Sequence, residues 1–185
     1  MRTRLAIPLL LAFCHGPLAA QTPDAAVMQA VLSDFTARKD TMSLHEDGVL
    51  LIEEQTVAWN KEKAAFNLPR RAGDKCPIGA GFVDALIARN PASESAAALI
   101  PQSSRWRLLR AGDVTQELAA LDKAPDGSLV KSIAAVGKPA YSEDGNTALV
   151  LFAFRWSRHG AMAKYFVHKA DNAWRTQCTE LVFYP

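Results

Sequence analysis

Apolar runs separated by turn signals recur through the last third of the chain, and this pattern restricts the segment to strands joined by short connections. The apolar runs lie at 130–136, 147–156, 162–169 and 174–184. The turn signals between the later runs are Glu143-Asp144-Gly145-Asn146, Ser157-Arg158-His159-Gly160 and Asp171-Asn172. Because turns of this length and composition join antiparallel neighbours, we predict an antiparallel meander of three or four strands.

The run from Thr147 to Phe154 is apolar on both faces of the strand that it predicts. A strand in the middle of a sheet, covered on both sides, has this composition. We therefore expect a helix to cover one side of this strand and further chain to cover the other.

Helix signals begin just after residue 21. Thr22 fits the N-cap, Pro23 the first helical position and Asp24 the first turn, where an acidic side chain is favourable. Apolar side chains then recur at four-residue spacing as far as about Arg38, at Val27, Val31 and Phe35. This stripe predicts an amphipathic helix that packs on the rest of the protein.

The middle of the chain gives shorter signals. We predict a strand at 49–58, a helix that includes Phe82 and ends before Asn90-Pro91, and a short helix at 93–100. Between 103 and 126 the pattern is compatible with a strand around Trp106, Leu108 and Leu109 and with one or two helical turns at 114–121. The whole order predicts an α+β fold, with N-terminal and middle helices packed on one face of an antiparallel sheet that ends in the meander.

The first twenty residues have the three parts of a secretory signal peptide. Met1-Arg2-Thr3-Arg4 is basic, residues 5–14 are apolar, and residues 15–20 end in small side chains. We expect cleavage after Ala20, which leaves one globular domain at 21–185 in the periplasm or the medium. An alternative is a lipoprotein, because the sequence that ends in Cys14 distantly resembles a lipobox.

The charge balance argues against nucleic acid as a partner. Arg2 and Arg4 account for the whole excess of 21 basic over 19 acidic side chains, so the chain without its leader is formally neutral. No basic run with interleaved aromatic residues follows. The sequence after residue 20 also contains no second apolar run long enough to cross a membrane.

Only Cys76 and Cys178 remain after the leader. In an oxidising compartment two cysteines predict a disulfide. The competing interpretation is that one of them is a catalytic thiolate.

The segment 139–150 contains the phrase Tyr-Ser-x-Asp-Gly-x-x-Ala-Leu-Val, and a hairpin and then Lys169 and Trp174 follow it. This C-terminal part resembles the meander of many small exported bacterial proteins of unassigned function. The resemblance covers about fifty residues and implies a shape: a tight Asp144-Gly145 turn, close packing at Ala148 and an apolar anchor at Trp174. A looser resemblance to cone-shaped domains of the nuclear-transport-factor-2 type carries over no catalytic residue.

Side chains that could act in catalysis or metal binding are scattered along the sequence. His45, His159 and His168 lack metal-ligand spacing, Glu53 and Glu54 would point to opposite sides of a strand, and Gly79-Ala80-Gly81 lacks the rest of a phosphate-binding loop. The sequence therefore predicts no metal, no cofactor and no catalytic residue. The strongest candidate for a binding surface is one face of the hairpin 147–169, formed by Arg155, Trp156, Lys164, Tyr165 and His168; the alternative is a solvated sheet surface with no ligand.

Two functions fit these observations. The first is a non-enzymatic periplasmic binding protein, of the immunity or inhibitor type, that holds an envelope protein or a small ligand through its sheet or through the loop at Arg70 and Arg71. The alternative is a small periplasmic hydrolase or isomerase with a cone-like cavity, in which His168 or His45 is the base.

Overall fold

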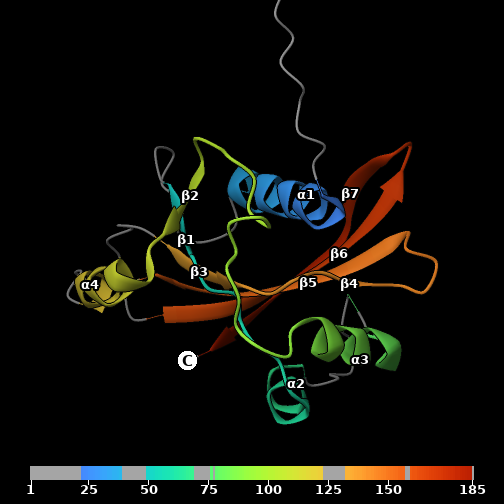
Figure 1. Ribbon diagram of the computed structural model, residues 1–185, viewed down its shortest axis with the longest axis horizontal. Helices are drawn as coiled ribbons and strands as arrows, with labels where there is room; N and C mark the ends of the chain where they lie inside the picture. The colour runs from blue at the N-terminus through green and yellow to red at the C-terminus, as the bar shows by residue number, and fades with distance from the viewer. Residues whose placement is uncertain are drawn as a thin grey trace, which may run out of the picture.

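Three long strands form one end of the β-sheet in the computed structural model, which describes residues 22–38, 49–68, 76, 78–122, 132–156 and 159–184. These strands are β5, β6 and β7, and each pairs antiparallel with the next along the chain (Figure 1). The helices and strands are α1 (Pro23–Ala37), β1 (Leu50–Glu53), α2 (Lys61–Asn67), α3 (Ala80–Arg89), β2 (Trp106–Leu109), α4 (Ala111–Asp122), β3 (Ile133–Val136), β4 (Ala140–Tyr141), β5 (Thr147–Trp156), β6 (His159–Ala170) and β7 (Ala173–Tyr184). The predicted α+β class and the C-terminal meander are confirmed.

The sheet is mixed rather than antiparallel throughout. Its order is β2-β1-β3-β5-β6-β7, with β4 paired to β5, and β1 runs parallel to both β2 and β3. Parallel neighbours need a crossover connection. Segments containing α2 and α3 connect β1 to β2, and a segment containing α4 connects β2 to β3.

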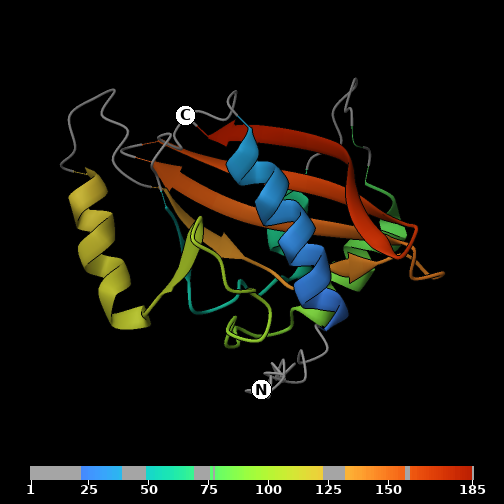
Figure 2. The same cartoon turned by 90° about the horizontal axis from the view of Figure 1, so that it is seen from above.

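Helices cover both faces of the sheet, whereas the sequence predicted them on one face. Figures 1 and 2 show α1 across one face, and Figure 1 shows α2 and α3 on the other. The central strand β5 divides its apolar side chains between the two faces: Val150 and Phe152 belong to the core under α1, and Leu149 and Leu151 to the core on the side of α3. The prediction of a strand covered on both sides is confirmed.

The predicted N-terminal helix is present as α1. Thr22 is its N-cap and accepts a hydrogen bond from the amide of Ala25 at 3.2 Å, and Pro23 occupies the first turn. Phe35 is fully buried, with its ring edge-on to those of Phe152 and Phe154 at centroid distances of 4.9 and 5.0 Å.

Two predictions for the middle of the chain are wrong in extent or type. The strand expected at 49–58 ends at Glu53, and the short helix expected at 93–100 is a series of turns. The cause is a long-range backbone pairing: the amide of Ala96 donates to the carbonyl of Glu54 at 2.7 Å, and that of Thr56 to the carbonyl of Glu94 at 2.8 Å. These hydrogen bonds use groups that a helix would need. The helix after residue 80 and the strand at 106–109 are confirmed as α3 and β2.

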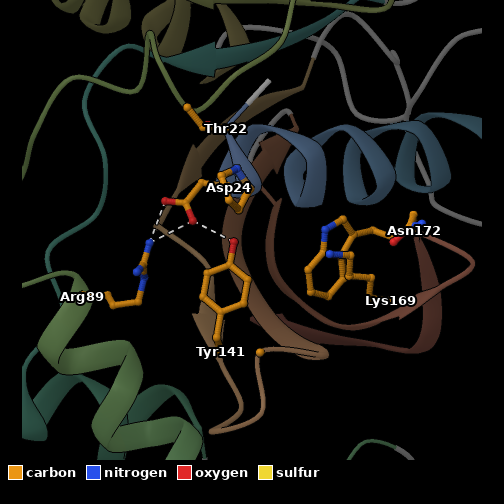
Figure 3. Close-up of a pocket in the computed structure, with 9 residues that line it drawn as sticks. Thr22, Asp24, Arg89, Tyr141, Lys169 and Asn172 are labelled. Carbon is orange, nitrogen blue, oxygen red and sulfur yellow. Dashed lines mark hydrogen bonds and ion pairs between the residues drawn. The ribbon is translucent and has the colours of Figure 1, made fainter. Parts of the chain in front are cut away.

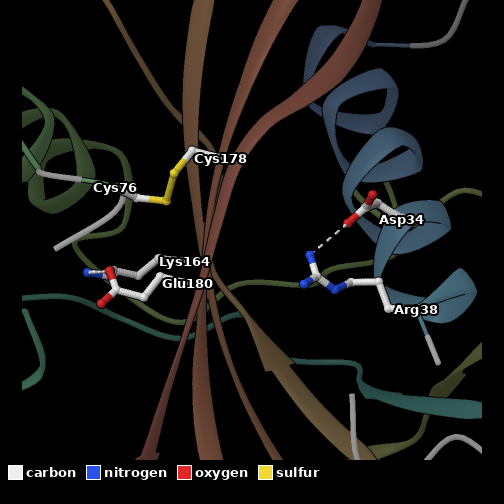
Figure 4. The surroundings of a disulfide bond; sticks show 6 residues. All are labelled: Asp34, Arg38, Cys76, Lys164, Cys178 and Glu180. Carbon is white, nitrogen blue, oxygen red and sulfur yellow. Dashed lines mark ion pairs between the residues drawn. A yellow bond between two sulfur atoms is a disulfide. The ribbon is translucent and has the colours of Figure 1, made fainter. Parts of the chain in front are cut away.

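The predicted disulfide joins Cys76 and Cys178, which lie 102 positions apart in sequence and have 5.8 Å between their Cα atoms. It ties the segment before α3 to β7, on the face of the sheet opposite α1 (Figure 4). A β-bulge in β7 makes this possible, since Phe166 pairs with Cys178 and Val167 with Thr176, which leaves Gln177 without a partner. The extra residue turns Cys178 to one face while Trp174, four positions earlier, remains on the face of α1.

Candidate functional site

A pocket opens where the beginning of α1, the end of α3, β4 and the β6–β7 turn come together (Figure 3). Its volume is about 730 Å³. We call it the Tyr141 pocket, and its lining consists of Thr22, Pro23, Asp24, Arg89, Tyr141, Gly145, Lys169, Asn172 and Trp174.

One wall of the Tyr141 pocket is a hydrogen-bonded triad from three separate elements. A guanidinium nitrogen of Arg89, Nη2, donates to both carboxylate oxygens of Asp24 at 2.9 and 2.7 Å. The hydroxyl of Tyr141 donates to Asp24 Oδ1 at 2.7 Å. Asp24 belongs to the first turn of α1, where the helix dipole also favours a negative charge. The triad therefore fixes α1, α3 and β4 to one another at the mouth of the pocket.

The ring of Tyr141 lies between a cation and a second aromatic ring. The Arg89 guanidinium carbon is 5.1 Å from the ring centroid of Tyr141, and the Trp174 ring is 5.9 Å away and tilted. Burial raises the pKa of the Tyr141 hydroxyl, and its hydrogen bond to the Asp24 carboxylate raises it further. Tyr141 therefore keeps its proton at neutral pH and acts as a hydrogen-bond donor, while Asp24 is engaged by two donors. This arrangement holds the wall in place.

The opposite wall comes from the β6–β7 hairpin. Its turn residues Asp171 and Asn172 both have positive φ, 51° and 60°, as a two-residue type I′ turn requires. Next to the turn Lys169 pairs with Trp174 across the two strands, so both side chains lie on the same face. Figure 3 shows Lys169 and Asn172 on the other side of Tyr141 from Arg89. Lys169 is exposed, and its ammonium group makes no ion pair within the described ranges.

The surface that the sequence proposed on the 147–169 hairpin is not assembled as one patch. Arg155 pairs with Gly160 at one end of the β5–β6 hairpin, whereas His168 pairs with Thr147 at the other end. Both side chains are exposed. The side chain of Trp156 lies outside the described residues.

The other two members of that proposed surface are buried on opposite faces of the sheet. Lys164 is 3% exposed and forms an ion pair with Glu180 on the face of the disulfide (Figure 4). Tyr165 is fully buried under α1, where burial raises the pKa of its hydroxyl and the nearby Asp34 carboxylate adds to this effect. Adjacent residues of a strand point to opposite faces, and this alternation separates the two side chains.

Several other predicted features fall outside the described residues. These are the leader at 1–20 with Cys14, the side chain of His159, His45, and Arg70 with Arg71. Within the described residues no group of three His, Cys, Asp or Glu side chains could hold a metal ion, and no helix is long and apolar enough to cross a membrane.

Sequence reasoning did not find the Tyr141 pocket. In the sequence Asp24 is a first-turn acid, Tyr141 belongs to the meander phrase and Trp174 is an apolar anchor, and each of these signals is local. Asp24 is separated from Arg89 by 65 positions and from Tyr141 by 117. The only local signal was the combination of aromatic and charged residues around two tight turns, at 142–146 and 169–174.

Comparisons with protein-family models, with curated protein sequences and with solved structures found no significant match to this chain. The resemblance of the C-terminal segment to small exported proteins stays a prediction.

Proposed function

We propose that the protein is exported and acts as a non-enzymatic binding protein, and that the Tyr141 pocket holds its ligand, a small polar molecule with one apolar face. The observation that carries this proposal is the pairing of a rigid aromatic wall with polar groups across the pocket, Lys169 and Asn172. Ligand sites in proteins commonly combine apolar surface with a few fixed polar groups in clefts of about 300 to 1,000 Å³.

The triad supports a binding role because it fixes the wall before any ligand arrives. Tyr141 is restrained by its hydrogen bond to Asp24 and by the guanidinium of Arg89. A site that is already ordered loses little conformational entropy when it binds. Lys169 and Asn172 are then available to hydrogen-bond the polar groups of the ligand, while Tyr141 and Trp174 contact its apolar face.

The enzymatic alternative needs a histidine beside a carboxylate in a pocket. His168 is exposed and is not among the residues that line the Tyr141 pocket. Nothing in the geometry of the described residues favours this alternative over binding.

Ligand-dependent stabilisation tests the proposed function. The purified protein is screened by thermal unfolding against monosaccharides, amino acids and aromatic carboxylates, because a ligand that binds only the folded state raises Tm in a concentration-dependent way. We expect at least one class to give a saturable increase. Trp174→Ala and Lys169→Ala should each weaken that response, and Lys61→Ala, on the exposed start of α2, should not. Saturable binding that survives both pocket substitutions would contradict the proposal.

Export has its own test. When the full chain is expressed in a bacterial host with an envelope, we expect the protein in the periplasmic fraction with an N-terminus at Gln21. Retention of the leader in the cytoplasm, or a lipid-modified N-terminus at Cys14, would contradict cleavage after Ala20.

A further inference from the structure

A second surface, separate from the Tyr141 pocket, lies at the opposite end of the strand order. β2 is the last strand of the sheet beside β1, and no strand in the described part of the chain pairs with its outer edge. The carbonyls of Arg105 and Leu109 accept hydrogen bonds from β1 and the residue that follows it. Because backbone groups alternate in direction along a strand, the N–H and C=O groups of Trp106 and Leu108 point away from β1, along the outer edge.

A groove runs beside this edge on the α1 face. Its volume is about 340 Å³, and its lining combines apolar residues, Ile100, Pro101, Trp106 and Leu108, with Gln102, Ser103 and Arg107. The indole of Trp106 is fixed by a hydrogen bond from its Nε1 to the carbonyl of Pro101 at 2.8 Å. The groove is therefore a formed feature beside the free edge.

The same edge carries a concentration of positive charge. Arg105, Arg107 and Arg110 are all exposed, and none of them makes an ion pair within the ranges that the structure describes. Since Leu109 packs in the core opposite α1, alternation places Arg105 and Arg107 on that face and Trp106 and Leu108 on the groove face. The two faces of the edge thus differ: apolar side chains predominate on the groove face, whereas Arg105 and Arg107, the latter also lining the groove, supply positive charge.

From this arrangement we propose that β2 binds an extended acidic segment of another protein, which adds to the sheet as a further strand. Backbone hydrogen bonds to Trp106 and Leu108 supply affinity, as in other cases of strand addition. Alternate side chains of the bound segment then meet different surroundings. Apolar residues enter the groove, and the acidic residues between them meet Arg105 and Arg107. The expected partner sequence alternates acidic and apolar residues.

Two other occupants fit the outer edge of β2 less well. Two copies of this chain joined through β2 would bring two sets of arginines together, which is unfavourable. A nucleic acid would satisfy the arginines but would use neither the groove nor the outward backbone groups.

Fluorescence anisotropy with short synthetic peptides tests the proposal. The probe is a labelled peptide of alternating glutamate and valine. The controls are a lysine–valine peptide and a glutamate–valine peptide N-methylated at every amide, which blocks strand pairing along both of its edges. We expect binding of the first peptide only, and slower amide hydrogen exchange at Trp106 and Leu108 in the complex. Equal binding of either control peptide would overturn the proposal.

Charge reversal at the edge gives an independent readout. Arg105→Glu combined with Arg107→Glu should weaken binding of the acidic peptide at least about tenfold at low salt, since attraction becomes repulsion at both positions. Lys61→Glu combined with Arg175→Glu changes the net charge equally at exposed sites on α2 and β7, and should leave binding unchanged. Equal weakening by both pairs of substitutions would overturn the proposal. So would displacement of the peptide by single-stranded DNA that does not occupy the groove, or self-association of the protein that requires β2.

Discussion

On one face of the sheet a single fifteen-residue helix, α1, covers an aromatic core. On the other face, besides α4, two shorter helices, α2 and α3, lie beside a disulfide and a buried ion pair. Under α1 the rings of Phe35, Phe152 and Phe154 contact one another. On the opposite face Lys164 and Glu180 form an ion pair near the disulfide (Figure 4).

The difference shows two ways to cover a sheet. A helix with a continuous apolar stripe gains enough from burial to stay in place without covalent help. Helices of seven and ten residues have little stability of their own. Their position depends on packing, and the Cys76–Cys178 bond limits how far that segment can separate from β7.

Removal of the disulfide should give the largest change in stability among the tests of this comparison. Cys76→Ala combined with Cys178→Ala should lower the free energy of unfolding by up to about 4 to 5 kcal/mol, the chain-entropy value for a loop of this size. Urea unfolding with fluorescence detection measures the change. Wild-type protein with reductant should match the variant, and a reduced protein as stable as the oxidised one would contradict the importance of this link.

A matched pair of phenylalanine substitutions compares the two cores directly. Phe35→Ala should cost about 3 to 5 kcal/mol because it leaves a cavity between Phe152 and Phe154. Phe82→Ala removes the same atoms from the edge-on contact with Phe166 on the other face, where Phe82 is only half-buried. We expect roughly half the cost there. Equal losses in chemical denaturation would remove the distinction between the faces.

The ion pair offers a smaller change on the disulfide face. Lys164→Met leaves the carboxylate of Glu180, 21% exposed, without its partner. We expect a loss of about 2 to 3 kcal/mol, below the value for a fully buried charge because water still reaches Glu180. Adding Glu180→Leu should restore most of the stability. A double variant that is less stable than Lys164→Met would show that the unpaired carboxylate of Glu180 is not the cause of the loss.

The smallest expected effect depends on pH. Burial raises the pKa of Glu53 on β1, and the charge of Arg155 offsets part of this shift. The folded state therefore holds the proton to a higher pH than the unfolded chain, so ionisation of Glu53 costs stability as pH rises above its ordinary pKa near 4.5. Glu53→Gln should be more stable than wild type at pH 7, and the difference should vanish below that ordinary value. Thermal unfolding across pH measures it, with Glu143→Gln on an exposed turn as the control for lost charge.

Local signals predicted the parts of the fold that depend on local chemistry. Thr22 and Pro23 marked the start of α1, and the Asp171-Asn172 pair marked a turn that the structure closes with two left-handed residues. The parallel pairing of β1 could not be predicted in this way, because its partners, β2 and β3, begin 56 and 83 positions beyond Leu50. The same limit explains the missing helix at 93–100, whose backbone groups bond to residues 54–56.

The candidate site was harder to predict than the fold. The predicted surface combined neighbouring residues of one hairpin, but adjacent residues of a strand, such as Lys164 and Tyr165, face opposite sides of the sheet. The register then placed Arg155 and His168 at opposite ends. The Tyr141 pocket depends on contacts between α1, α3 and β4, and side-chain type alone does not reveal which distant residues will meet.

The bulge at Gln177 has a consequence for how β7 can vary. Trp174 and Cys178 are both even-numbered, yet their side chains point to opposite faces of the sheet. The unpaired Gln177 between them shifts the alternation by one position and makes this possible. Deleting Gln177 would shift one end of the strand by a single position, so that either the indole would leave the pocket or the sulfur would leave Cys76. The length of this four-residue interval is therefore set by two requirements on opposite sides of the sheet, and insertions or deletions there should be tolerated less well than almost any substitution.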